Sequence, residues 1–219
     1  MIFDFDYTLA DSSRGVLECV NYALEGLGLP RVAAEDAKRT IGLSLPDTLV
    51  SLAGREHEGE GREFSRLFGE RADQVMTDLT EVFEEAPGVI GRLKSGGVTL
   101  GVVSTKFRYR IEDILGRVGL LEAFDVIVGG EDVSRHKPDP EGLLAAIGRL
   151  GGSPSNTLYV GDSVTDAEAA RRAGVPFVAV LNGVTPREAF EDYPVEGVLE
   201  NLRELVEHLE AGLKTSGRS

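Results

Sequence analysis

The chain has almost no cysteine and is short of positive charge. Its 219 residues include a single cysteine, Cys19, which excludes a disulfide bond within the chain. Lysine and arginine together number 23, against 37 aspartates and glutamates, and the formal net charge is −14. Proteins that bind nucleic acids or anionic membranes need a basic face, so the composition argues against both partners. A small anionic ligand is still compatible with it, because a local lysine and a metal ion can override the overall field.

Long apolar runs are also missing. No run of apolar residues in the sequence is long enough to cross a bilayer. The chain does not open with the basic residues and apolar segment that mark a secretory signal. We therefore expect a cytoplasmic protein that binds no membrane, and the sequence gives no indication of its oligomeric state.

Short apolar runs alternate with amphipathic segments along most of the chain. The apolar runs predict strands at 2–5, 99–103, 125–128, 157–160 and 176–180. Most of these runs are continuously apolar, which is typical of strands buried on both faces of a parallel sheet. Helical spacing of apolar residues is found at 110–118, 140–150, 166–173 and 200–213. The pattern predicts an α/β fold in which helices cover both faces of a parallel sheet.

The region from residue 12 to residue 85 breaks the alternation, because it predicts helices and no strand. Helical patterns cover 16–27, 33–41, a segment from Pro46, and 63–82, with a charged break at 54–61. A helical insertion of this size between the first and second strands is typical of a cap domain. We therefore predict an α-helical cap at 13–85 and a core formed by 1–12 and 86–219, with linkers near 11–13 and 85–88.

Polar residues gather at the predicted carboxyl ends of the strands, where open parallel sheets bind ligands. In chain order these residues are Asp4, Asp6 and Thr8 after the first strand, Ser104, Thr105 and Lys106 after the second, Lys137 after the third, and Asp162 and Asp166 after the fourth. Each has an ordinary structural explanation when taken alone, such as a helix cap or a turn. The interpretation depends on four elements that occur in order, each at a strand end.

These residues form a chemically coherent set. Several carboxylates at one point need a cation, and their hard oxygen ligands suit Mg²⁺. A hydroxyl of Ser104 or Thr105, together with backbone N–H groups, would hold phosphoryl oxygens, and Lys137 would neutralise charge. One carboxylate could attack phosphorus to form an aspartyl-phosphate, while a second protonates the leaving oxygen and later deprotonates water. Two acids can divide these roles because their surroundings separate their pKa values.

The chain resembles the haloacid dehalogenase superfamily in four motifs. They are Asp-Phe-Asp-Tyr-Thr-Leu at 4–9, Ser104, His-Lys-Pro-Asp-Pro at 136–140 and Gly-Asp-Ser-Val-Thr-Asp at 161–166. The phrases Ala-Pro-Gly-Val at 86–89 and Ile-Gly-Leu-Ser-Leu-Pro at 41–46 are similar to its phosphoglycolate phosphatase branch. The resemblance covers nearly the whole chain. It implies a Rossmann-like core with a small helical cap after the first strand, and a Mg²⁺-dependent phosphoric monoester hydrolase.

The resemblance also implies a role for each motif residue. Asp4 would be the nucleophile and Asp6 the acid/base. Mg²⁺ would be held by Asp4, the backbone carbonyl of Asp6 and Asp162, with Asp166 in support. The phosphoryl group would be bound by Ser104 and Lys137, and we place Thr105 with them.

The substrate is expected to be a small phosphorylated metabolite. Asp6 favours phosphate-ester hydrolysis, because the dehalogenases of the superfamily lack an acid at this position. A phosphoglycolate-like ester is the first expectation. Pyrophosphate or a nucleotide stays an alternative, since Ser-Thr-Lys-Phe-Arg at 104–108 looks closer to pyrophosphate-cleaving relatives. Two non-enzymatic alternatives are a silent ligand-binding relative and a phospho-accepting signalling domain, and the complete motif set and the helical insertion argue against them.

Four residues are candidates for setting the substrate. Tyr7 stands where the family usually has glycine, and it would either contact the leaving group or pack under the cap. Ser44 lies in the predicted cap loop at 42–46. Lys106, Arg108 and Arg110 form a local cationic cluster, and one of them could meet a second anionic group of the substrate. For Arg108 and Arg110 an ordinary solvated helix start is the favoured explanation.

Overall fold

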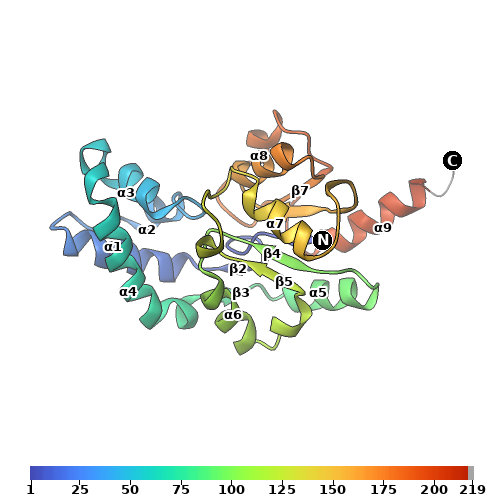
Figure 1. The fold of residues 1–219 in the computed structure, drawn as a ribbon, viewed down its shortest axis with the longest axis horizontal. Helices are drawn as coiled ribbons and strands as arrows, with labels where there is room; N and C mark the ends of the chain where they lie inside the picture. Colours follow the sequence, from blue (N-terminus) through green and yellow to red (C-terminus); the bar gives the residue numbers. More distant parts are fainter. Residues whose placement is uncertain (217–219) are drawn as a thin grey trace.

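Six parallel strands form one sheet at the centre of the molecule (Figure 1). The computed structural model describes the backbone of residues 1–216 and the side chains of residues 1–211; residues 217–219 of the predicted core lie outside it. The strands are β1 (Ile2–Phe3), β4 (Gly101–Val103), β5 (Val126–Val128), β6 (Tyr159–Gly161), β7 (Phe177–Val180) and β8 (Gly197–Leu199). Their order is β5-β4-β1-β6-β7-β8, so β1 lies between β4 and β6. Phe3 is level with Val102 and Val160, which brings the residues that follow these three strands to one edge of the sheet.

Helices cover both faces of this sheet, as the alternating pattern predicts. One face is packed by α5 (Ala86–Ser95), α6 (Arg108–Arg117) and α9 (Glu204–Ser216). The other is packed by α7 (Glu141–Arg149) and α8 (Val164–Ala173). The α/β prediction is confirmed and each of the five predicted strands is present. Strand β8 and helix α5 were not predicted, because β8 is a short edge strand and the glycines at 88, 91, 96 and 97 made α5 resemble a connecting loop.

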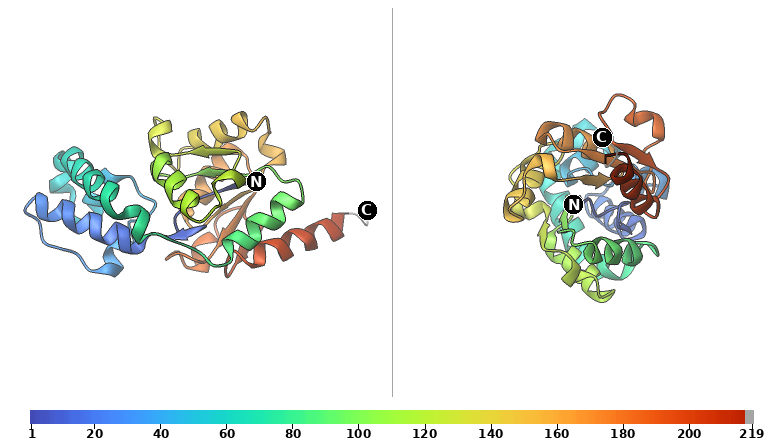
Figure 2. Two further views of the ribbon diagram at one scale, coloured as in Figure 1. Left: turned by 90° about the horizontal axis from the view of Figure 1, so that it is seen from below. Right: turned by 90° about the vertical axis from the view of Figure 1, so that its right-hand side faces the viewer.

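A second group of helices forms a lobe beside the sheet, shown on the left of both Figure 1 and the left panel of Figure 2. It contains α1 (Ser13–Gly26), α2 (Ala34–Lys38), α3 (Leu45–Ala53), the 3₁₀ helix η1 (Arg55–Glu60) and α4 (Gly61–Leu79). Helices α1 and α4 pack through a buried apolar cluster that includes Cys19, Leu24 and Phe64. A Cβ atom at Gly15 would lie 2.7 Å from Met76 Sδ, so glycine permits this close approach. Within residues 1–216, no helix is both long enough and apolar enough to span a membrane.

The chain passes between the lobe and the sheet along a small antiparallel pair, β2 (Ala10–Asp11) and β3 (Glu81–Val82). The prediction that the last helix of the insertion continues to residue 82 was therefore wrong, and so was the prediction that the insertion contains no strand. Helix α4 ends at Leu79 because Thr80 is extended and the next residues pair with β2. Val82 and Phe83 then pack against the core of the sheet. The assignment of 13–85 to a cap domain stays a prediction.

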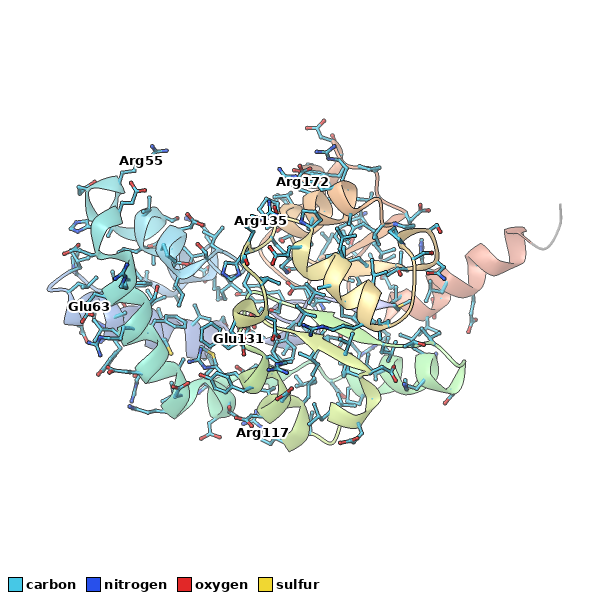
Figure 3. All side chains as sticks on the ribbon, viewed as in Figure 1. Arg55, Glu63, Arg117, Glu131, Arg135 and Arg172 are labelled. Atoms are coloured by element: carbon cyan, nitrogen blue, oxygen red, sulfur yellow. The ribbon has the colours of Figure 1, made fainter. Side chains whose placement is uncertain are left out.

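Arg110 connects α6, which packs on the sheet, to α4 of the helical lobe. The expectation of a solvated side chain was wrong, because Arg110 is only 6 % exposed. Its Nη2 donates to Asp73 Oδ1 at 2.6 Å and to the Gly69 carbonyl at 3.2 Å. At the far end of α6, Arg117 Nη2 donates to the Thr80 carbonyl at 2.6 Å, and Figure 3 shows Arg117 there. These contacts hold α4 against α6.

We expect Arg110→Ala to lower the free energy of unfolding by about 1–3 kcal/mol, because a buried, charge-assisted contact is lost while the partly exposed Asp73 returns to water. Urea denaturation measures this loss. Arg14→Ala is the matched control, since the Arg14–Glu81 pair is 69 % and 72 % exposed and should change stability by less than about 1 kcal/mol. Equal losses in the two variants would contradict a structural role for the Arg110 contact.

Candidate active site

Three buried carboxylates meet at the carboxyl edge of the sheet. Asp4 follows β1, Asp162 follows β6, and Asp166 lies in the first turn of α8. One oxygen atom from each of the three lies within 4.8 Å of the others. Because β1 and β6 are neighbours, the sheet itself brings the first and fourth sequence motifs together. A cluster of hard oxygen donors at this spacing fits a divalent cation such as Mg²⁺.

Among the described residues, Lys137 is the cation that contacts this cluster. Its Nζ lies 2.8 Å from Asp4 Oδ1 and 2.6 Å from Asp166 Oδ1, and its side chain is 6 % exposed. Asp166 also accepts hydrogen bonds from the Tyr159 hydroxyl at 2.8 Å and the Ser163 hydroxyl at 2.6 Å. These bonds fix Asp166, which in turn holds the lysine beside Asp4.

Burial raises the pKa of Asp4 to about 7, although the nearby Lys137 charge acts in the opposite direction. Burial likewise raises the pKa of Asp162 well above its usual range, and the Asp166 and Asp4 carboxylates add to this effect. Three buried carboxylates thus face one lysine, and the remaining negative charge favours either a proton or a cation.

Magnesium should therefore stabilise the protein more at high pH than at low pH. The folded pKa of Asp4, about 7, lies above its unfolded value, so this group's favourable contribution is present below about pH 4 and is lost as the pH rises through 7. A cation that replaces the proton compensates for this loss. We expect Mg²⁺ to raise the melting temperature by several degrees at about pH 8 and by much less at about pH 5.5. Calorimetry with and without Mg²⁺ measures the melting temperature at both pH values. An equal rise at both would contradict the prediction. The Asp162→Asn variant should lose the stabilisation by Mg²⁺.

The Asp6 side chain is held apart from the carboxylate cluster. Its Oδ1 accepts a hydrogen bond from the Ser12 hydroxyl at 2.5 Å and lies 3.2 Å from Lys106 Nζ. The Lys106 side chain is 6 % exposed, so this ion pair is buried. Of the four residues predicted for the metal, Asp6 therefore has a carboxylate engaged elsewhere. This geometry is compatible with a backbone carbonyl as its metal ligand.

Tyr7 adopts the left-handed backbone conformation, with φ 56°. The chain reverses here, and the Tyr7 amide donates to the Ala10 carbonyl at 2.7 Å. Glycine accepts this conformation without strain, which gives a physical reason for the glycine usual in the family. The Tyr7 side chain is buried, and a Cβ atom at Gly183 would lie 3.1 Å from Tyr7 Cβ and would overlap Asp162 Oδ2. Tyr7 therefore packs beside the carboxylates and is not among the residues that line the cavity described below.

The hydroxyl motif lies beside the lysine. Ser104, Thr105 and Lys137 line a shared small recess, and Ser104 Oγ accepts a hydrogen bond from the Lys106 amide at 3.2 Å. Arg108 is placed elsewhere: its Nε lies 3.4 Å from Asp132, and its amide donates to the Glu131 carboxylate at 2.9 Å. Figure 3 shows Glu131 next to the start of α6.

A cavity of about 370 Å³ lies between the helical lobe and the sheet edge. Asp6, Thr105 and Lys106 line it from the sheet side, and the loop between α2 and α3 lines it from the lobe. Ser44 is part of this lining and also caps α3, where its hydroxyl donates to Asp47 Oδ2 at 2.5 Å. Of the four predicted specificity residues, the structure places Ser44 and Lys106 at the cavity, and it does not place Tyr7 or Arg108 there.

Sequence reasoning missed Tyr159 and Ser12. Tyr159 belongs to an apolar run and reads as core filling, although its hydroxyl bonds to Asp166. Ser12 reaches Asp6 only because the chain folds back after the first strand, which residue types alone do not indicate.

A parallel sheet whose central strand ends in Asp-x-Asp beside a buried lysine, with a helical lobe beside it, is the arrangement that the resemblance to hydrolases of the haloacid dehalogenase superfamily implies. Residues 1–180 match the family described as haloacid dehalogenase-like hydrolase, and the chain belongs to this family.

Curated relatives and solved structures agree with this assignment. The phosphoglycolate phosphatase of Salmonella paratyphi A is 32 % identical over 208 residues, which cover 85 % of this chain and 82 % of the relative. The phosphoglycolate phosphatase of Yersinia pseudotuberculosis is 30 % identical, with 93 % and 90 % covered. The crystal structure of a haloacid dehalogenase-like hydrolase from Bacteroides fragilis superimposes with a TM-score of 0.90 at 41 % identity, covering 93 % of this chain and 97 % of that one.

Proposed function

We propose that the protein hydrolyses a small phosphate monoester in a Mg²⁺-dependent reaction through an aspartyl-phosphate on Asp4. The observation that carries this proposal is the placement of two acids one residue apart in different surroundings. Asp4 is buried against Lys137 at 2.8 Å, whereas Asp6 is held by Ser12 and Lys106 at the wall of the cavity. This separation suits one acid to attack and the other to proton transfer.

In the first step an Asp4 oxygen forms a bond to phosphorus while the bond from phosphorus to the leaving oxygen breaks. Asp6 gives its proton to that oxygen, so an alcohol departs. In the second step Asp6 takes a proton from water, the water oxygen bonds to phosphorus, and the Asp4–phosphorus bond breaks to release phosphate. Lys106 and Ser12 orient Asp6 for both transfers.

The remaining residues bind charge. Lys137 holds Asp4 in place and would neutralise negative charge on the phosphoryl oxygens. Ser104 and Thr105 would donate hydrogen bonds to these oxygens. A bound Mg²⁺ ion would neutralise phosphoryl and carboxylate charge, and its ligands would be Asp4, Asp162 and the backbone carbonyl of Asp6, with Asp166 in support.

The names of the curated relatives make phosphoglycolate the first compound to test, followed by pyrophosphate and nucleoside monophosphates. The test is phosphate release with Mg²⁺ from a panel of these compounds, sugar phosphates and simple alkyl phosphates. We expect release from at least one ester, and its loss when EDTA removes the metal. If the protein is folded by circular dichroism and releases phosphate from none of the compounds, only a ligand-binding role remains.

A further inference from the structure

The cavity between cap and core has a mostly apolar wall. Its side chains come from the loop between α2 and α3, from the start of α3, from α4 and from the loop before α6. The main apolar ones are Ile41, Leu43, Leu45, Phe68, Met76 and Phe107. Its volume of about 370 Å³ falls in the range of pockets that enclose an organic ligand, about 300–1,000 Å³. A two-carbon acid such as glycolate would leave much of this space unfilled.

The two long cations on the wall already have acidic partners. Lys106 pairs with Asp6, and Arg110 pairs with Asp73. A substrate carboxylate in this cavity would have to compete with Asp6 for Lys106, or else lose water without gaining a cation. Competition for Lys106 would disturb Asp6, the proposed acid/base. Loss of water without a cation would lower the affinity for the substrate.

The hydroxyl groups of the cap wall are also engaged. The Thr40 hydroxyl donates to the Ala37 carbonyl at 2.8 Å, and the Ser65 hydroxyl donates to the Gly61 carbonyl at 2.7 Å. Ser44 donates to Asp47. These three hydroxyls serve the fold of the cap. His136, Thr48 and Thr105 add polar atoms to the lining, and the rest of the wall is largely hydrocarbon.

We propose that the preferred substrate is the phosphate monoester of an uncharged, mainly apolar alcohol about the size of one ring, and that glycolate and second phosphates are poor leaving groups here. This inference rests on the proposed phosphatase function. Asp6 lies at the wall of the cavity, so an alcohol that receives its proton extends from the catalytic edge into the apolar space under the cap.

The test compares kcat/KM for phosphoglycolate, pyrophosphate, ethyl phosphate, n-butyl phosphate and benzyl phosphate. Alkyl and benzyl esters keep the chemical step similar, so differences report the fit of the leaving group. Each buried methylene should raise kcat/KM about threefold to fourfold. We therefore expect n-butyl phosphate to exceed ethyl phosphate by about tenfold, and benzyl phosphate to exceed phosphoglycolate by at least as much.

Leu43→Lys places a cation on the wall at a position that tolerates it, because Leu43 is 37 % exposed. The ratio of kcat/KM for benzyl phosphate to that for phosphoglycolate should fall at least about tenfold. Leu144→Lys is the matched control: Leu144 is 43 % exposed, lies on α7 and is not part of the lining, so the ratio should not change.

The possible failures are distinguishable. If phosphoglycolate or pyrophosphate is cleaved at least as well as benzyl phosphate, the inference is overturned and the phosphatase function stands. An equal effect of both lysine variants on the ratio overturns it as well. If the folded protein cleaves none of the five compounds but cleaves a sugar phosphate or a nucleoside monophosphate, the inference is overturned and the phosphatase function stands. If it cleaves no compound of the wider panel, the proposed function fails and the inference fails with it.

Discussion

Asp4→Asn should lower kcat for phosphate release by about 10⁴-fold or more, because it removes the nucleophile and no other carboxylate occupies its position at the end of β1. The amide has the shape of the carboxylate but does not attack phosphorus. Steady-state release of phosphate from the best substrate of the panel measures the effect. A kcat within tenfold of the unmodified protein would contradict the assignment of Asp4.

The same variant should remain folded. Burial raises the pKa of Asp4 to about 7, so the surroundings already accommodate a neutral group at this position. Lys137 keeps its contact with Asp166 at 2.6 Å. The melting temperature of Asp4→Asn without metal should therefore equal or exceed that of the unmodified protein.

Asp11→Asn provides the matched control. Asp11 is a half-buried acid on β2, close to Asp4 in sequence, and its Oδ1 accepts a hydrogen bond from the Ser13 amide at 2.8 Å. An asparagine oxygen can accept the same bond. The kcat of Asp11→Asn should stay within about threefold of that of the unmodified protein. A loss as large as that of Asp4→Asn would mean that any nearby change of charge stops the reaction.

Lys137→Met should lower both stability and turnover. Without this lysine the buried carboxylates of Asp4 and Asp166 lose the cation that contacts them, and the cluster that they form with Asp162 loses its neighbouring positive charge. Breaking a buried ion pair from one side costs about 3–5 kcal/mol, and we expect a loss in that range in metal-free protein. The kcat/KM should fall by about 10²–10³-fold, because the phosphoryl charge also loses a partner. Urea denaturation and steady-state kinetics measure the two effects.

A double variant separates these effects. Adding Asp166→Asn to Lys137→Met removes one of the stranded carboxylates, so part of the lost stability should return while activity does not. Lys94→Met is the surface control, since the Lys94–Asp125 pair is 35 % and 41 % exposed and should cost less than about 1 kcal/mol. Equal destabilisation by Lys137→Met and Lys94→Met would contradict a buried cation at the site.

The central strands and the catalytic edge could be predicted because both depend on local sequence. Continuous apolar runs mark strands buried on two faces, and the carboxyl ends of such strands meet at one edge. That reasoning found Asp4, Asp162 and Lys137, which the structure brings together. Strand β8 was not predicted, because it is short and lies at the edge of the sheet, where the apolar pattern of the sequence is weakest.

The partners of individual side chains could not be predicted, because they depend on how distant segments pack. Lys106 was predicted as a candidate substrate contact and does line the cavity, but its ion pair with Asp6 at 3.2 Å was not predicted. Arg110 was expected in solvent, whereas α4 of the helical lobe packs over it and supplies Asp73. Arg108 points instead to Asp132. A run of cations at a helix start indicates local charge and does not indicate which residue the fold will bury.

We expect the phosphoryl group to be transferred to Asp4 during turnover. The most direct measurement is to quench the protein during turnover of its best substrate, reduce it with borohydride and analyse the N-terminal peptide by mass spectrometry. Borohydride reduces an acyl phosphate to an alcohol, so residue 4 should be recovered as homoserine, and only when substrate is present. An unmodified Asp4 in protein that is rapidly releasing phosphate, or the same modification at Asp6 instead, would contradict the account.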